Sequence, residues 1–345
     1  MGARKKHAPR RGSMGFSPRK RASRLVPRVK SWPDVDLGRP TLLGFLGYKV
    51  GMTHAYIVDD RPGRPTHGKE IFVPVTVVET PPLFVLAVRL YGYDPNRGLY
   101  SMGEAWAYPP PELEIWRKVK TLGSLDPDKK LKELEEMLPL AREVRVLAAT
   151  QPKLVGGLSK KKPDIIEVKV GGTSDLGELF DYASKRLGEL VKIQEVFAEG
   201  QMVDVIAVTK GKGFQGVVKR WGVKELPRWH KHRKGSRRIG ARSHGKGVWS
   251  ETPQAGQTGF HRRTEYNKRI LMIDEDGYKI TPAGGFLHYG VVRSTYTVLA
   301  GSIPGTPKRP VVLRYPVRPP RWYLALEEVK KPQITFVSLQ SKQGN

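Results

Sequence analysis

The ten residues Glu70–Glu79 read EIFVPVTVVE, a run of β-branched and aromatic side chains that is typical of a β-strand. Thr80-Pro-Pro82 follows with turn-forming residues, and strand character then resumes. The same alternation of short apolar runs and turns recurs along most of the chain. We predict further strands over residues 41–50, 55–58, 83–91, 203–209, 269–273, 291–299, 311–315, 322–326 and 334–339. This spacing favours an all-β barrel or sandwich.

Residues 93–192 show a different pattern, in which helical segments accompany short strands. A helix is predicted to begin at Asp126, whose side chain can cap it, with Pro127 in its first turn, and to end at Pro139. A second predicted helix begins near Ser174 and ends at Gly188, and strands are predicted over 145–150 and 165–170. The predicted fold is therefore mainly β, with an α/β insertion. Its expected parts are a basic N-terminal extension (1–40), a β-barrel body (41–92 and 193–345), the insertion (93–192) and a long loop within the barrel (210–262).

The charge of the chain is concentrated in three segments. Among 345 residues, 61 Lys and Arg stand against 33 Asp and Glu, which gives a net charge of +28. Residues 1–30 hold +11, residues 209–246 hold +12 and residues 308–321 hold +5, so these three segments account for all of it. A single basic run is often only a solvated surface, but three on an otherwise neutral chain predict a polyanionic partner.

Several classes of protein are excluded by composition. The chain has no cysteine, which excludes disulfide scaffolds, thiol nucleophiles and cysteine-based metal centres. No apolar run approaches the roughly 18 residues that span a bilayer. Because the basic N-terminus has no apolar core, we expect no secretory signal. We expect a soluble protein of the cytoplasm.

Two glycine motifs and a histidine group raise the alternative of an enzyme. Residues 211–216 (GKGFQG) match the spacing of a dinucleotide-binding turn, but no acid follows at the distance that binds the ribose. Residues 240–246 resemble a phosphate loop, yet Gly247 stands where a magnesium-binding hydroxyl is required. Three histidines, His230, His232 and His244, lie among cations that would repel a metal ion. An RNA-modifying or nucleotide-using enzyme therefore stays the weaker alternative, and we predict no cofactor and no metal.

The loop over 210–262 is better explained by contact with RNA. Its many glycines allow a backbone to approach a ribose-phosphate chain closely, and its Arg and Lys side chains offer phosphate contacts. Its large aromatic residues could stack on unpaired bases, although Trp221 and Phe260 are equally well explained as anchors of the loop. The basic segments contain too many Gly and Pro residues for the amphipathic helix that adhesion to an acidic membrane would need. An extended cationic arm fits a crevice in folded RNA.

Several ordered motifs resemble a known family, the third universal protein of the large ribosomal subunit in its archaeal and eukaryotic form. The resemblance runs along nearly the whole chain. The motifs are SMGF (13–16), PRKR (18–21), FLGYK (45–49), GMTH (51–54), ETPP (79–82), DVIAVTKGKG (204–213), GQTG (256–259), HRRTE (261–265) and GGFLHYG (284–290). One departure is clear, since Ala241-Arg242-Ser243 stands where many relatives carry a tryptophan at the loop tip. Some relatives carry a modified histidine in this loop, and His232 is its nearest match here.

The resemblance implies a six-stranded barrel of the translation-protein type, interrupted by an α/β insertion. It implies a structural protein without catalysis that binds large-subunit rRNA and neighbouring ribosomal proteins, acts early in assembly and reaches toward the peptidyl transferase centre. From the basic segments and the resemblance together, we predict a set of rRNA-binding residues. They are Arg4, Lys5, Lys6, Arg10, Arg11, Arg19, Lys20, Arg21, Arg24, Lys210, Lys212, Phe214, Lys219, Arg220, Trp221, Arg228, Trp229, His230, Lys231, His232, Arg233, Lys234, Arg237, Arg238, Arg242, His244, Lys246, Trp249, His261, Arg262, Arg263, Lys268, Arg269, Lys308 and Arg309.

Overall fold

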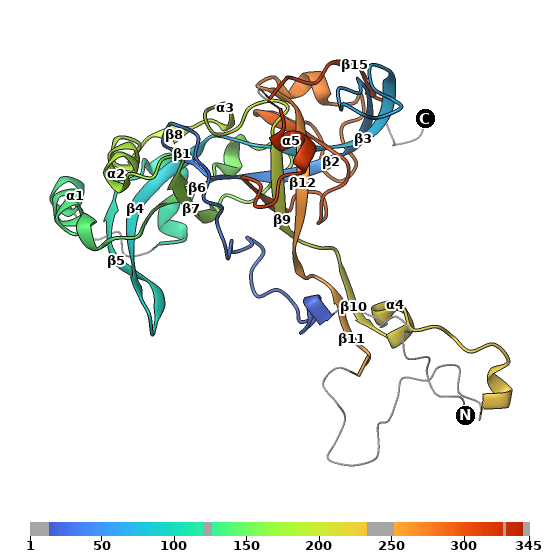
Figure 1. The fold of residues 1–345 in the computed structure, drawn as a ribbon. Coiled ribbons are helices and arrows are strands. Elements are labelled where there is room, and N and C mark those ends of the chain that lie inside the picture. Colours follow the sequence, from blue (N-terminus) through green and yellow to red (C-terminus); the bar gives the residue numbers. More distant parts are fainter. Residues whose placement is uncertain (1–13, 120–125, 233–251, 327–328, 341–345) are drawn as a thin grey trace, which may run out of the picture. The chain divides into compact units, whose positions relative to one another are not determined.

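The computed structural model describes residues 14–119, 126–232, 252–326 and 329–340 (Figure 1). The chain divides into two compact units. The first, which we name the basic unit, comprises residues 1–23 and 209–262. The second, which we name the body, comprises residues 24–208 and 263–345.

Strands dominate the body, as the sequence predicts. The strands are β1 (Thr41–Leu42), β2 (Gly44–Val58), β3 (Glu70–Glu79), β4 (Leu83–Asp94), β5 (Gly98–Trp106), β6 (Glu143–Ala149), β7 (Ile165–Gly171), β8 (Leu190–Val191), β9 (Met202–Val208), β10 (Gly211–Gln215), β11 (Gly256–Gly259), β12 (Arg262–Asp274), β13 (Tyr296–Ala300), β14 (Pro310–Arg314) and β15 (Ile334–Val337). The α-helices are α1 (Pro127–Glu136), α2 (Leu176–Lys185), α3 (Ile193–Val196), α4 (Val217–Trp221) and α5 (Arg321–Leu324). The 3₁₀-helices are η1 (Met14–Phe16), η2 (Pro111–Leu113), η3 (Ile115–Arg117), η4 (Leu138–Leu140), η5 (Pro152–Leu154), η6 (Trp229–His232) and η7 (Gly277–Ile280).

Six strands of the body close into a barrel. Their order is β14-β9-β12-β13-β3-β2, and a further pairing of β14 with β2 completes the ring, while β15 adds to the far end of β2. Closure leaves no open edge among the six strands, which removes the pairing hazard of an exposed strand. The mainly β prediction is confirmed, and the six-stranded barrel that the resemblance implies is present.

Buried carboxylates tie the barrel strands to their loops. Glu79 on β3 is fully buried and accepts hydrogen bonds from the Tyr289 hydroxyl and from the backbone amides of Arg293 (3.0 Å) and Ser294 (2.8 Å). Asp204 on β9 is also fully buried and pairs with Arg314 on β14 at 2.6 Å. A buried carboxylate is tolerated only when it is paired and hydrogen-bonded, so both residues hold specific loop geometries.

A second sheet forms the α/β insertion. Its order is β1-β7-β6-β4-β5, with β8 paired to the start of β4. Side chains of α1 and α2 belong to the hydrophobic cluster on one face, and Leu113 and Ile115 of η2 and η3 belong to the cluster on the other. Because β4 pairs with insertion strands and not with the barrel, we propose that the insertion begins near Leu83, before the expected boundary at residue 93.

The predicted and observed strands differ at several places for identifiable reasons. The break expected at Gly51 is a bulge within the continuous strand β2, where an added Cβ would lie 2.7 Å from the Phe286 ring. The strand predicted over 291–299 begins only at Tyr296, as β13 (Tyr296–Ala300), because the amides of Arg293 and Ser294 donate to Glu79. The strand predicted over 322–326 is wrong, since Pro320 caps the short helix α5 there. The edge strand β5 was not predicted, because GLYSMGEAW is rich in glycine and polar residues.

Candidate nucleic-acid interface

The basic unit is built on a two-stranded antiparallel ribbon. The chain leaves barrel strand β9, forms β10, and returns through β11 to β12. In the ribbon Gly211 pairs with Gly259, and Gln215 pairs with Gly256. The register shifts between Gly211 and Phe214, where Gly213 has φ +64°, so the ribbon carries a bulge. The loop predicted over 210–262 therefore contains regular structure at its base.

Glycine is required at the end of the ribbon where it rejoins the barrel strand. Gly259 has φ +71°, and a Cβ added there would lie 2.0 Å from the carbonyl oxygen of Lys210. The same carbonyl accepts the amide of Phe260 at 3.1 Å, and the amide of Thr209 donates to the carbonyl of His261 at 2.9 Å. These bonds hold the two chain segments together at a distance that any larger residue would prevent.

The N-terminal segment docks on this ribbon and on α4. The amide of Ala22 donates to the carbonyl of Phe260 at 2.8 Å, and the ring Nδ1 of His261 contacts the carbonyl of Lys20 at 2.9 Å. Arg19 donates to the carbonyl of Arg220, and Arg220 donates back to the carbonyl of Arg19 at 3.0 Å. Two basic segments that lie about 200 residues apart in sequence therefore form one surface.

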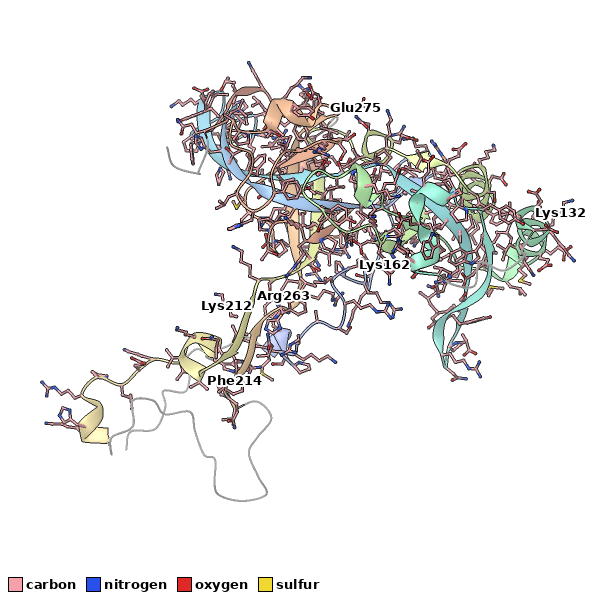
Figure 2. The ribbon with its side chains drawn as sticks, turned by 180° about the vertical axis from the view of Figure 1, so that it is seen from behind. Lys132, Lys162, Lys212, Phe214, Arg263 and Glu275 are labelled. Atoms are coloured by element: carbon pink, nitrogen blue, oxygen red, sulfur yellow. The ribbon has the colours of Figure 1, made fainter. Side chains whose placement is uncertain are left out.

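The aromatic residues of the basic unit have two different roles. The guanidinium carbon of Arg19 lies 3.8 Å from the centroid of the Trp221 ring, and the indole nitrogen donates to the carbonyl of Gln254 at 2.8 Å. Trp221 is therefore an anchor of the unit, one of the two interpretations that the sequence allows. Phe214 on β10 is 77 % exposed and carries its ring on the surface near Lys212 (Figure 2). Only the second of these rings is free to stack on a base.

The electrostatics of the basic unit favour an anion. Its 77 residues contain 22 Lys and Arg against two acids, Glu225 and Glu251, which gives +20 of the total +28. Burial, together with the adjacent charge of Arg220, lowers the pKa of Arg19. Cations held close together without carboxylates repel one another, and a polyanion would relieve that repulsion.

The described members of the predicted RNA-binding set divide into exposed and internally bonded side chains. Arg24 and Lys308 are exposed on the body, and Arg262 and Arg263 are half-buried. The exposed members in the basic unit are Lys20, Arg21, Lys210, Lys212, Phe214, Lys219, Arg228, His230 and Lys231. The members bonded inside the protein are Arg19, Arg220, Trp221, His261, Lys268, Arg269 and Arg309.

Arg269 is a correction to that set. Its side chain is buried, and its guanidinium makes two hydrogen bonds of 2.6 and 2.5 Å to the carboxylate of Asp60. It also donates to the carbonyl of Gly200 at 3.2 Å. Because its donors are used within the barrel, we remove it from the proposed surface.

Part of the predicted set lies outside the described residues. These members are Arg4, Lys5, Lys6, Arg10, Arg11, Arg233, Lys234, Arg237, Arg238, Arg242, His244, Lys246 and Trp249. The backbone of Trp229 and His232 forms η6, and their side chains are outside the description as well. The predicted loop tip at Ala241-Arg242-Ser243 falls in the same undescribed range.

The glycine motif that suggested an enzyme has a different structure. Residues 211–216 form β10 and the residue before α4, and α4 has only five residues. A dinucleotide-binding turn joins a buried strand to a long helix whose N-terminus faces the phosphates, so this geometry does not match it. No helix within the described residues is long and apolar enough to cross a membrane. In the same part of the chain, no cluster of three or more His, Asp or Glu side chains could hold a metal ion.

Comparison with known proteins shows the family of the chain. A family model described as ribosomal protein L3 matches residues 1–344. The chain belongs to the ribosomal protein L3 family. It is 76 % identical to the large ribosomal subunit protein uL3 of Aeropyrum pernix over the full length of both chains. It is 54 % identical to that of Caldivirga maquilingensis, with 98 % of each chain covered, and 51 % identical to that of Sulfurisphaera tokodaii over both full lengths.

Family membership confirms the resemblance found in the sequence motifs. One basic surface of this L3-family chain was nevertheless missed by the sequence reasoning. It lies in the insertion, where Trp116 and Arg117 meet the run Lys160-Lys-Lys162 around an open depression. The two segments are more than forty residues apart in sequence, and each alone carries too few charges to stand out. A search for short basic runs next to an unexplained tryptophan would have found them.

Proposed function

We propose that this L3-family protein is a structural constituent of the large ribosomal subunit that binds large-subunit rRNA through the basic unit. The observation that carries the proposal is the joining of the N-terminal segment and the central ribbon into one unit with a net charge of +20. We further propose that it acts early in subunit assembly, supports RNA near the peptidyl transferase centre, contacts neighbouring ribosomal proteins and works in the cytoplasm. It performs no catalysis.

The geometry supports binding by insertion between RNA strands. The ribbon is narrow and glycine-rich, so its backbone can approach sugar and phosphate closely. Exposed Lys212 lies on β10 and exposed Lys210 directly precedes that strand, and the exposed ring of Phe214 on β10 supplies a flat surface for an unpaired base. Because the N-terminal segment is hydrogen-bonded to the ribbon, both would enter the RNA together. Neutralised phosphates release counterions, which makes the binding strongly dependent on salt.

Two deletions test the proposal through that salt dependence. Removing residues 1–13 takes away five cations, and replacing residues 233–251 with a short Gly-Ser linker takes away six cations and one acid. Each phosphate contact contributes a slope of about 0.7 to 0.9 to the plot of log affinity against log salt. We expect the slope for large-subunit rRNA to fall by up to about 4.5 in the first variant and by up to about 5.4 in the second. Removal of residues 341–345, which carry one lysine, is the control, and unchanged slopes in both deletions would refute the proposal.

A further inference from the structure

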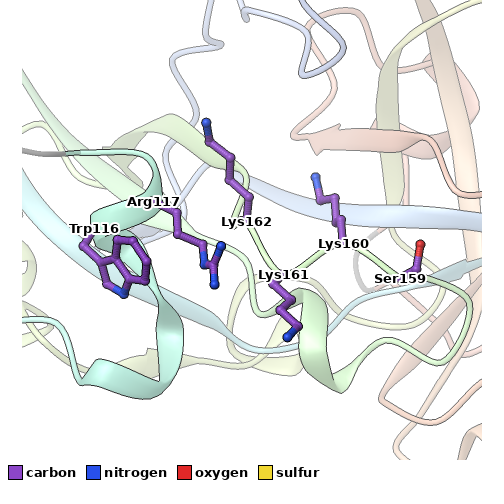
Figure 3. Close-up of a pocket in the computed structure, with 6 residues that line it drawn as sticks. All are labelled: Trp116, Arg117, Ser159, Lys160, Lys161 and Lys162. Atoms are coloured by element: carbon purple, nitrogen blue, oxygen red, sulfur yellow. The ribbon is translucent and has the colours of Figure 1, made fainter.

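The missed surface of the insertion is an open depression with a cationic lining. It is lined by Trp116, Arg117, Ser159, Lys160, Lys161 and Lys162 and has a volume of about 790 Å³. The first two residues belong to η3, and the others belong to the loop between η5 and β7. In the view of Figure 3, the tips of Arg117 and Lys161 are turned to the same side as the Trp116 ring, and those of Lys160 and Lys162 are turned to the opposite side. None of the lining residues is acidic.

Trp116 is held at this surface by buried neighbours although its own ring is 60 % exposed. Ile115, the preceding residue, is 1 % exposed and packs with Leu113 against the insertion sheet. The carboxylate of Glu114 forms one ion pair with Arg117 and a second with Lys153 at 2.8 Å. These ion pairs hold the short helix η3 in place. The Arg117 guanidinium carbon lies 4.7 Å from the centroid of the indole ring. Tryptophan is usually well buried, so a rigidly presented, exposed ring points to a binding role.

The loop that carries Lys160, Lys161 and Lys162 is anchored by the buried residue that follows it, Asp164. Asp164 is buried, and its carboxylate accepts the hydroxyl of Tyr48 on barrel strand β2 at 2.8 Å. Its amide donates to the side chain of Thr150 at 3.1 Å, and its carboxylate also pairs with Lys160. This network satisfies Lys160 and fixes the loop end.

Lys161 and Lys162 remain exposed, and neither pairs with a carboxylate of the described residues. Nearby Lys118 shows how crowded the positive charge is, because burial and the charges of Lys160 and Lys162 lower its pKa against the opposing effect of Asp164. Lys161 and Lys162 are therefore two adjacent cations that remain able to bind phosphate, whereas Arg117 and Lys160 are paired with Glu114 and Asp164.

We propose that this depression binds an unpaired nucleotide of RNA, with the base stacked on Trp116 and the flanking phosphates bound by Lys161 and Lys162. The proposal rests on the proposed function for its RNA partner, but it concerns a second site in the body that is separate from the basic unit. A nucleotide combines a flat ring with an anion on each side, which matches the lining. An acidic peptide matches the charges but gives no reason for the single exposed indole.

Binding of the full-length chain to large-subunit rRNA tests the site. Trp116→Ala should reduce affinity by about 5-fold to 150-fold without changing the salt slope, because stacking involves no counterion release. Lys161→Ala combined with Lys162→Ala should lower the slope by about 1.4. The matched control is Lys129→Ala combined with Lys132→Ala, which removes two exposed lysines from helix α1 of the same insertion and should leave affinity and slope unchanged.

Ultraviolet crosslinking of assembled large subunits, read by peptide, separates the two proposals. We expect an RNA crosslink on the peptide that contains Trp116, in addition to crosslinks from the basic unit. Crosslinks from the basic unit alone, with normal binding by the Trp116 and lysine variants, would overturn this inference and leave the proposed function intact. A crosslink on the Trp116 peptide without any crosslink from the basic unit would support the nucleotide site and contradict the proposed role of the basic unit. A zero-length crosslink from Lys161 or Lys162 to an acidic peptide of another protein would also overturn it.

Discussion

Arg19→Ala should release the N-terminal segment from the ribbon. The Arg19 guanidinium lies 3.8 Å from the Trp221 centroid and donates to the carbonyl of Arg220. A cation–π contact at such a site contributes about 0.5 to 1 kcal/mol, and a hydrogen bond from a charged group contributes about 1.5 to 3 kcal/mol. Because Arg19 is partly exposed, we expect a loss near the low end, about 2 kcal/mol. The detached population of the segment should then increase roughly 30-fold.

Hydrogen exchange at the amide of Ala22 measures this release, since that amide donates to the carbonyl of Phe260 at 2.8 Å in the docked segment. Exchange should accelerate roughly 30-fold in Arg19→Ala. Arg21→Ala is the matched control, because it removes the same charge from an exposed side chain two residues away. Equal exchange rates in the two variants would show that Arg19 does not dock the segment on the ribbon, and would contradict the joining of the two basic segments through this side chain.

Three further predictions concern the ribbon and the barrel. Gly259→Ala should disrupt the ribbon and accelerate exchange of the Phe260 amide, whereas Gly216→Ala, where a methyl group meets nothing within 4 Å, should leave it unchanged. Asp204→Asn leaves Arg314 buried without its charged partner and should reduce the free energy of unfolding by about 3 to 5 kcal/mol in denaturant titrations. The control is Asp34→Asn, whose side chain is 90 % exposed; it should reduce the free energy of unfolding by less than about 1 kcal/mol. The hydrogen bonds from Arg269 lower the pKa of Asp60 below its usual 3.8, so this contribution to stability is complete above that pH and is lost as pH falls through the lower value. The stability difference between wild type and Asp60→Asn should therefore shrink below about pH 3.8, and a constant difference would contradict the linkage.

Much of the barrel could be predicted from the sequence because its strands are continuous apolar runs. The segments predicted as 70–79 and 311–315 match β3 and β14 to within a residue. Strand closure could not be predicted, because the pairing of β14 with β2 joins residues more than 250 positions apart. The failure at 322–326 has a local cause, since Trp322 and Tyr323 favour a strand by composition while Pro320 begins a helical turn.

The charge of the sequence predicts which segments belong to the candidate interface, but not how those segments are joined. The basic segments identify both halves of the surface, and they place Lys212 and Phe214 on it. They do not reveal that Arg19 and Trp221 serve to join those halves, because a cation–π contact over 200 residues of separation leaves no sequence pattern. Likewise, nothing in the run around Arg269 distinguishes a guanidinium that binds RNA from one that is bonded to Asp60 inside a barrel.

The two units use the same cationic side chains in opposite ways. In the body, buried guanidinium groups such as those of Arg269 and Arg314 are matched to the carboxylates of Asp60 and Asp204. In the basic unit, 22 cations stand against two acids, which leaves a net charge of +20. The described part of the unit is held against this repulsion by backbone hydrogen bonds, by side-chain hydrogen bonds such as those of Arg19, Arg220 and Trp221, and by the Arg19–Trp221 contact. RNA phosphates would remove that repulsion, so binding and ordering of the basic unit should strengthen each other.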